Sequence, residues 1–303
     1  METTADKPVK LANRRAMKVT MSKKAKTVSS PFAYMLLGAL LMGAIYWGHS
    51  SWAELTEHST QINELARASA MTEIAYQYQT GAGGVTQDYA KAMDWYQKAA
   101  ALGDPDALKG IGWLYSSGLG VPQDYTEAMK WYEKAADAGS AAAMNNIGWM
   151  YQNAWGVSQD LSEAIVWYKK AAEPTATTPG GFAEAMYNLG NLYLNGPPGV
   201  ADTTQAAAWF GKGAQAGNLN SMTNYGVLLI LGQGVPQNYT EAINWLMKSA
   251  AAGNKGAMTW LGDCYSRGIG VAMDMQAARA WYKKAADAGD PDAQKWLADN
   301  PGN

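Results

Sequence analysis

The sequence has very few of the residues on which most enzymes and metal proteins rely. Its 303 residues include one cysteine and two histidines, His49 and His58. A single cysteine excludes an intramolecular disulfide framework and any zinc or iron–sulfur site built from several cysteines. Beyond His58 the chain lacks the commonest general base and metal ligand. We therefore expect no catalytic, cofactor-binding or metal-ligating residues, and we interpret the chain as a protein that is not an enzyme.

Charged side chains are also scarce, at 17% of the chain, and the net charge is −2. This balance argues against nucleic acid as a partner, because proteins that bind it carry a basic surface. The two signs are unevenly distributed, however. Residues 1–30 contain eight basic and two acidic side chains, a net +6, whereas the remaining residues carry a net −8. A basic segment ahead of an acidic body is typical of a targeting or membrane-topology signal.

One long apolar run, residues 32–48, follows the basic segment without a single charge. At about 1.5 Å per residue its helix would span roughly 25 Å, enough to cross a thin bilayer. Tyr34, Tyr46 and Trp47 lie near its ends, as in an aromatic belt. The pattern predicts a cytoplasmic tail (1–30), a transmembrane helix (31–48) and a periplasmic body. The protein would then be a single-pass protein of a bacterial inner membrane.

A cleaved signal peptide is the alternative interpretation of the same segment. Ser51 and Ala53 are small residues at the positions that signal peptidase requires for a cut before Glu54. The basic segment is long for a signal peptide, but it has an ordinary length if translation starts at Met17 or Met21. The body would then be secreted. Both interpretations export the C-terminal part of the chain.

Internal repetition is the strongest signal in the sequence. Six tryptophans recur 36 residues apart, except for one interval of 42. Each has a lysine three residues later, an alanine three residues earlier and another alanine five residues later. The long interval contains six extra residues around 174–180, which we interpret as an inserted loop. The tryptophans are Trp95, Trp131, Trp167, Trp209, Trp245 and Trp281.

Each repeat has the pattern of two helices, A and B. In the second copy the apolar spacing predicts an A helix over about 106–116 and a glycine-rich loop over 118–123. Asp124 is expected to cap helix B in a capping box with Glu127, a device that recurs as Asp160 with Glu163. Gly139 is expected to end the helix.

These units predict an all-α fold: an α-solenoid of six helix–turn–helix repeats of about 36 residues over 68–303. Residues 291–298 are expected to form a capping helix, and residues 49–67 a polar linker. The transmembrane helix would precede this solenoid. The first copy departs from the others, since Ala75 replaces a glycine and the loop 81–84 is one residue longer.

A glycine at the centre of the A helices is locally unfavourable, because each weakens a helix by about 1 kcal/mol relative to alanine. We expect these glycines to make room for the large tryptophan of helix B, so that Gly148→Leu would unfold the array. The glycines are Gly112, Gly148, Gly190, Gly226 and Gly262.

Cys264 stands in a column of apolar residues and is predicted to be a buried, inert thiol.

The unit Ala-x-x-x-Leu-Gly-x-x-Tyr-x-x-Gly-x-Gly-Val-x-x-Asp-x-x-x-Ala-x-x-Trp-Tyr-x-Lys-Ala-Ala-x-x-Gly resembles the Sel-1-like repeat, a branch of the tetratricopeptide-like α-solenoids. The resemblance covers about residues 70–298. Repeats four and five depart from it, with Phe210, Leu229 and Leu246 in tyrosine columns. The resemblance implies a scaffold or adaptor for protein–protein interaction. A cysteine-rich branch is linked to β-lactamase activity, but its paired cysteines are absent here.

Two equivalent positions of the A helices, three residues apart, differ from repeat to repeat, and their residue types favour the binding of a partner. They carry amides flanked by tryptophans, which suit an extended peptide backbone or the face of a sugar ring. We expect a protein or peptide partner here; the alternatives are a glycan, as in peptidoglycan assembly, and, less favoured, a hydrolase of the β-lactamase type. A packing role for the asparagines also stays open. The candidate partner-binding residues are Trp113, Asn146, Trp149, Asn188, Asn191, Asn224, Trp260 and Asp263.

Overall fold

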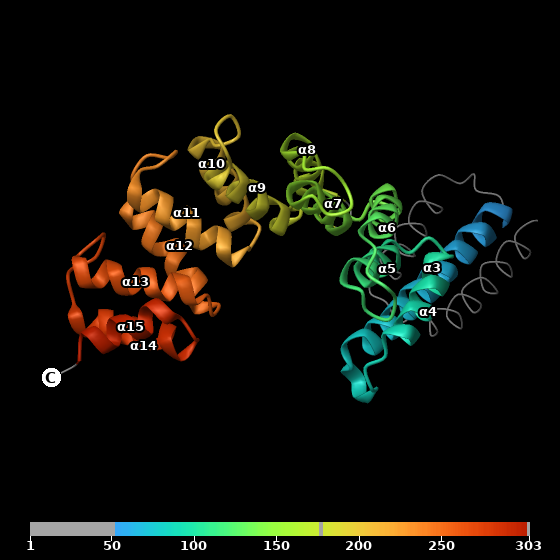
Figure 1. Cartoon of the computed structure of the whole chain (residues 1–303), viewed down its shortest axis with the longest axis horizontal. Helices are drawn as coiled ribbons and strands as arrows, with labels where there is room; N and C mark the ends of the chain where they lie inside the picture. The colour runs from blue at the N-terminus through green and yellow to red at the C-terminus, as the bar shows by residue number, and fades with distance from the viewer. Residues whose placement is uncertain (1–51, 176–177, 302–303) are drawn as a thin grey trace, which may run out of the picture. The chain divides into compact units, whose positions relative to one another are not determined.

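The computed structural model describes residues 52–175 and 178–301, and these residues form thirteen α-helices and one short 3₁₀ turn, with no strand among them (Figure 1). The all-α prediction is confirmed for this part of the chain. The predicted tail (1–30) and transmembrane or signal segment (31–48) lie outside the described residues. None of the described helices is long and apolar enough to span a bilayer. The chain divides into two compact units, Met1–Gln123 and Asp124–Asn303.

The N-terminal unit contains one long helix and the beginning of the repeat array. Helix α3 runs without a break from Trp52 to Thr80, so most of the predicted linker and the first A helix form a single helix. The turn η2 (Ala82–Gly84), α4 (Tyr89–Ala100) and α5 (Pro105–Ser117) follow. Helix α4 contacts both α3 and α5.

The C-terminal unit continues the alternation of A and B helices, and Figure 1 shows them following one another in chain order. Each helix contacts the next one along the chain. The last, α15, is the predicted capping helix. The helices are α6 (Tyr125–Asp137), α7 (Ala141–Asn153), α8 (Leu161–Ala172), α9 (Ala183–Asn195), α10 (Thr203–Gln215), α11 (Leu219–Leu231), α12 (Tyr239–Ala251), α13 (Lys255–Arg267), α14 (Met275–Asp287) and α15 (Pro291–Asp299).

The glycines of the A helices make room for a different residue than predicted. A Cβ on Gly148 would lie 2.8 Å from the ring of Tyr168, the residue that follows Trp167. Gly190 and Gly262 meet Phe210 and Tyr282 in the same way. The tyrosine column therefore fills the core between the helices of a repeat, and our assignment of that space to the tryptophan is wrong.

The tryptophan column instead lies half-buried at the surface, each ring covered by the lysine three residues later. The lysine Nζ atoms lie 4.1 to 4.4 Å from the ring centroids in all six repeats. One helical turn places the two side chains on the same face, so this cation–π contact is local to each B helix.

The predicted caps of the B helices are present, but only half of each capping box forms. Asp160 accepts a hydrogen bond from the backbone N–H of Glu163 at 3.0 Å. Its own N–H does not pair with the Glu163 carboxylate; it donates to the carbonyl of Tyr151, in the preceding A helix, at 3.1 Å. The cap residue therefore joins the two helices of a repeat as well as starting the second one.

In most repeats the loop between the helices begins with left-handed backbone, although Gly196 in the fourth repeat is extended, with φ −67°. Gly118, Gly232 and Gly268 supply it with φ values of 64 to 69°, as their recurrence predicts. In the third repeat Ala154 takes this conformation, with φ 57°, and is the one non-glycine residue with positive φ in the described part of the chain. Left-handed backbone is costly for a residue with a Cβ, so it persists only where the surrounding structure fixes it.

Candidate functional site

The A helices of the C-terminal unit approach one another across the repeats. Helix α7 contacts α9, α9 contacts α11, and α11 contacts α13. Such contacts between equivalent helices are typical of the inner side of a solenoid, where successive repeats are closest. Seven of the eight predicted partner-binding residues lie on these four helices. We call them the A-helix surface: Asn146, Trp149, Asn188, Asn191, Asn224, Trp260 and Asp263.

Three asparagines of this surface have side-chain amides with no internal partner. Asn146, Asn191 and Asn224 are half-buried, and none of them forms a side-chain hydrogen bond with a described residue. Their carbonyl and NH₂ groups are therefore available to a ligand, one on each of three successive A helices.

The fourth asparagine has a structural role. The Nδ2 of Asn188 donates to the Oδ1 of Asn145 at 2.8 Å, which joins α9 to α7. Asn145 is buried, so this bond satisfies an amide that water does not reach freely. For Asn188 the packing interpretation of the asparagine column is the correct one.

Trp149 provides the aromatic part of the surface. It is 38% exposed, and its ring meets Trp155 edge-on with 4.0 Å between the centroids. Trp155 in turn lies 4.7 Å from the ring of Tyr125, the first residue of α6. The result is an aromatic cluster that begins at the solvent and ends on the preceding B helix.

Sequence reasoning missed Trp155. The equivalent loop residues are Leu119, Gln233 and Ile269, so a large ring at this position is peculiar to the third repeat. That departure from the column was a usable signal. Its neighbour Gly156 packs so closely on the backbone of Tyr125 that a Cβ there would lie 2.7 Å from the carbonyl carbon. The close packing fixes the loop and positions Trp155.

The last two members of the surface are engaged within the sixth repeat. The Oδ1 of Asp263 accepts a hydrogen bond from the Tyr282 hydroxyl at 2.8 Å and lies 3.6 Å from Nη2 of Arg267. Trp260 packs against the buried cluster that includes Leu261. Both residues stabilise the repeat, and only their exposed edges are available for binding.

Trp113, the eighth predicted residue, belongs to the N-terminal unit. It lies on α5 with its ring 6.5 Å from that of Tyr89. That partner is the first residue of the B helix α4, whereas the partner of Trp149 is the loop residue Trp155.

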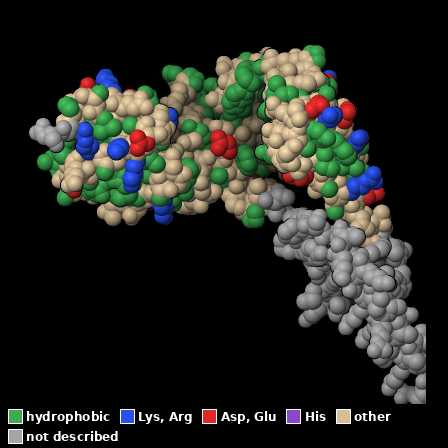
Figure 2. Space-filling model, turned by 90° about the horizontal axis from the view of Figure 1, so that it is seen from below, with side chains coloured by type: hydrophobic (Ala, Val, Ile, Leu, Met, Phe, Trp, Pro, Cys, Tyr) green, Lys and Arg blue, Asp and Glu red, His purple; other side chains and the backbone are tan. Residues whose placement is uncertain are grey.

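The chemistry of these surfaces is polar and aromatic. Figure 2 shows acidic and basic side chains interspersed with hydrophobic ones on the face it presents. Among the described residues no three His, Cys, Asp or Glu side chains gather in a way that could hold a metal ion.

Cys264 is fully buried, as predicted, and burial raises the pKa of its thiol to about 11. The thiol is therefore protonated at neutral pH.

Stacked helix pairs with a variable inner surface define an α-solenoid repeat protein. The Sel1 repeat model matches the chain six times, at residues 68–104, 105–140, 141–173, 183–218, 219–254 and 256–290. These matches cover more than half of the chain, so the protein belongs to the Sel1 repeat family, whose members generally serve as scaffolds for protein interaction. The resemblance seen in the sequence is confirmed.

Two solved structures agree with this assignment. A Sel1 repeat protein from Oxalobacter formigenes is 34% identical, with a TM-score of 0.65, over 73% of this chain and 88% of that one. The protein c5321, a protective antigen of uropathogenic Escherichia coli strains, is 29% identical with a TM-score of 0.66. The match covers 93% of this chain but only 59% of c5321. No curated protein matched significantly.

Proposed function

We propose that this chain is a non-enzymatic scaffold that holds an extended segment of a partner protein along the A-helix surface. The observation that carries the proposal is the set of free amides on Asn146, Asn191 and Asn224. An extended peptide presents N–H and C=O groups at regular intervals, and asparagine can both donate to and accept from them. The Trp149–Trp155 pair supplies an apolar anchor beside the first amide.

The test is the triple substitution of Asn146, Asn191 and Asn224 by alanine. Each lost hydrogen bond is worth about 1 kcal/mol, so together they should weaken partner binding roughly a hundredfold. Asn244→Ala is the matched control, since Asn244 is exposed on the B helix α12 and forms no side-chain hydrogen bond with a described residue.

The measurement is affinity capture by the full-length chain, followed by calorimetry with the captured partner. The triple variant should lose the partner that the wild type and Asn244→Ala retain, while its circular dichroism stays native. Equal binding by all three proteins would remove the A-helix surface from the proposal. Asn188 is left unchanged because its substitution would also break the bond to Asn145.

A glycan ligand is the second candidate, and the exposed ring of Trp149 is what favours it. Sugar rings stack on exposed tryptophan faces, and neighbouring amides bind their hydroxyl groups. Trp149→Ala separates the two candidates when soluble peptidoglycan fragments are titrated into the chain. If the fragments bind and Trp149→Ala abolishes their binding, the glycan is favoured. If the fragments do not bind, the peptide is the candidate ligand that remains.

We also propose that the scaffold is exported and tethered to the inner membrane by residues 32–48. The support is the uncharged apolar run and the basic segment before it. N-terminal sequencing of the mature protein tests the tether against signal cleavage. A first residue at Glu54 would show that the scaffold is secreted, and retention of the segment would favour the anchor.

A further inference from the structure

The inserted loop changes the junction between the third and fourth repeats. At the junction after α6, the B helix is followed by Gly139 with φ 88° and then by Ser140, whose side chain caps the next A helix. After α8 the chain leaves the helix in extended conformation at Glu173, with φ −69° and ψ 142°. Helix α9 starts after Phe182, which provides no side-chain cap. The two repeats are therefore joined by a longer, differently shaped connection.

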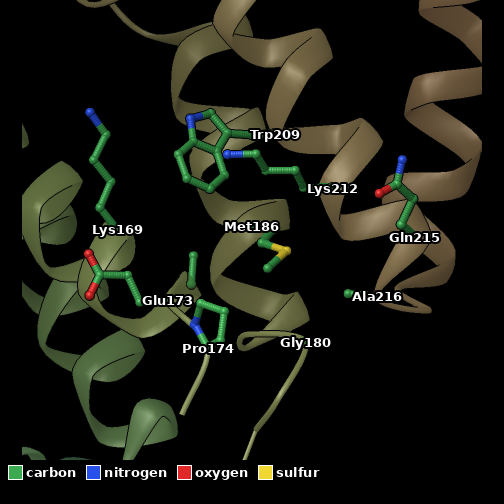
Figure 3. Close-up of a pocket in the computed structure, with 10 residues that line it drawn as sticks. Lys169, Glu173, Pro174, Gly180, Met186, Trp209, Lys212, Gln215 and Ala216 are labelled. Carbon is green, nitrogen blue, oxygen red and sulfur yellow. The ribbon is translucent and has the colours of Figure 1, made fainter.

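A pocket of about 610 Å³ lies beside this connection, lined by residues of α8, α9 and α10 and by Pro174 and Gly180 of the loop. Figure 3 shows Met186 in its interior, with Pro174 below it and the ring of Trp209 above. Gly181 holds the loop close to α8, because a Cβ there would collide with the carbonyl oxygen of Ala172. The volume lies in the range of pockets that take small ligands or a few peptide residues.

The rim of the pocket is charged, with two lysines against one carboxylate. Lys169 and Glu173 project from the α8 side, and Lys212 lies across from them beside Trp209 (Figure 3). Neither Lys169 nor Glu173 forms a side-chain ion pair or hydrogen bond with a described residue. The Nζ of Lys212 lies 4.1 Å from the Trp209 ring centroid and pairs with no carboxylate of the described residues. The rim is thus net positive on a chain whose residues beyond 30 carry a net −8.

We propose that this pocket binds an acidic, apolar peptide segment of a partner protein. An apolar side chain of the peptide lies against Met186 and Trp209, and an adjacent carboxylate lies between Lys169 and Lys212. The apolar interior favours burial of the side chain, and the two lysines, neither of which pairs with a described carboxylate, favour an anion over a cation. The pocket shares no residue with the A-helix surface, so this proposal and the proposed function can fail independently.

Two fluorescein-labelled pentapeptides test the charge preference, one with the sequence Gly-Asp-Leu-Asp-Gly and one with Gly-Lys-Leu-Lys-Gly. Their binding to the full-length chain in mild detergent is followed by fluorescence anisotropy. The acidic peptide should bind at least tenfold more tightly than the basic one. Equal binding of the two peptides, or no binding of the acidic one, would overturn the proposal.

Charge reversal locates the binding in this pocket. Lys169→Glu combined with Lys212→Glu should weaken binding of the acidic peptide about tenfold, since two ion pairs are replaced by repulsion. Lys283→Glu with Lys248→Glu is the matched control, because these lysines occupy the same two columns in other repeats. The control should change the Kd less than twofold. An equal loss in both double variants would show general charge attraction and would overturn the site.

Glu173→Gln makes the rim more positive, whereas the lysine substitutions make it more negative, and it hardly changes the size of the side chain. Removing the carboxylate from the rim should tighten binding of the acidic peptide two- to threefold at low salt. Circular dichroism should be the same in all of these proteins. Weaker or unchanged binding by Glu173→Gln would contradict the proposed electrostatic recognition even if the lysine variants failed to fold.

Discussion

Replacing Gly148 by alanine tests the packing that holds each repeat together. Helix propensity alone predicts that the substitution stabilises α7 by about 1 kcal/mol. The structure predicts the opposite sign, because the new Cβ would lie 2.8 Å from Cδ1 and Cε1 of Tyr168. That distance is well inside the ordinary contact of two carbon atoms. The two arguments therefore make opposing predictions for one methyl group.

The magnitude follows from what the Tyr168 ring can do. The residue is fully buried, and its hydroxyl donates to Oε1 of Gln152 at 2.8 Å, so the ring cannot move aside without losing that bond. Overpacking of a core by one methyl group typically destabilises by 1–3 kcal/mol, and a lost hydrogen bond adds about 1. After the gain in propensity we expect a net loss of about 2 kcal/mol. The larger side chain of Gly148→Leu should unfold the array.

The assay is urea unfolding followed by far-UV circular dichroism. Gly256→Ala in α13 is the matched control, since the only neighbouring atom near its Cβ is Oδ1 of Asn254 at 3.4 Å. That variant should be stabilised by up to about 1 kcal/mol. Both variants replace a helical glycine by alanine, and of the two only Gly148 lies against a buried ring.

A second variant ties the loss to Tyr168. In the fifth repeat Leu246 takes the place of the tyrosine. A Cβ on Gly226 would lie 3.1 Å from the Cγ of Leu246, which is a less severe contact. Tyr168→Leu should therefore reduce the effect of Gly148→Ala by at least half in a double-mutant cycle. An unchanged or higher unfolding midpoint for Gly148→Ala in the wild-type background would refute the reasoning.

Two further predictions concern the core of the C-terminal unit. The buried Ser221 hydroxyl has no hydrogen-bond partner among the described residues, and it would clash with a Cβ on Gly213. The other repeats have alanine in the Ser221 column. Gly213→Ala alone should therefore destabilise, but together with Ser221→Ala it should raise the free energy of unfolding by about 1–2 kcal/mol in urea titrations. A double variant less stable than wild type would count against this account. Because burial raises the Cys264 pKa from 9.0 to about 11, the native thiol should resist iodoacetamide at pH 8 and react in urea. The free energy of unfolding should fall between pH 9 and 11, because the thiol loses its proton in the unfolded state before it does so in the folded state. The fall should be smaller in Cys264→Ala. Labelling of the folded protein by iodoacetamide at pH 8 would refute the prediction.

Much of the fold was predictable because its determinants are local and occur in six copies. The cap at Asp160 and the left-handed loop at Gly118 depend on a few neighbouring residues, and so do the helix boundaries of each repeat. Even the exception at Ala154 stands out against the glycine of the other repeats. The family followed from the same spacing. The sequence also singled out Asn146, Asn191 and Asn224 as candidates, but their columns could not show whether the amides are free.

Which of two adjacent residues enters the core was decided only by tertiary packing. Trp167 and Tyr168 are neighbours about 100° apart on helix α8, and either could face the glycine of α7 by periodicity. The sequence likewise could not show that Asn188 bonds to Asn145 or that Asp263 receives the Tyr282 hydroxyl, because these partners come from different helices.

The sequence by itself determined the repeat, its helices, their caps and the position of the inserted loop, since each of these is set by backbone geometry over short stretches of chain. The tertiary structure decided which side chains of the A-helix surface are free and what the insertion creates. Lys169 and Lys212 are more than one repeat apart in the sequence, and they line one pocket only because α8 and α10 both lie beside it. Long-range proximity of this kind depends on how the helices stack, and no single repeat encodes it.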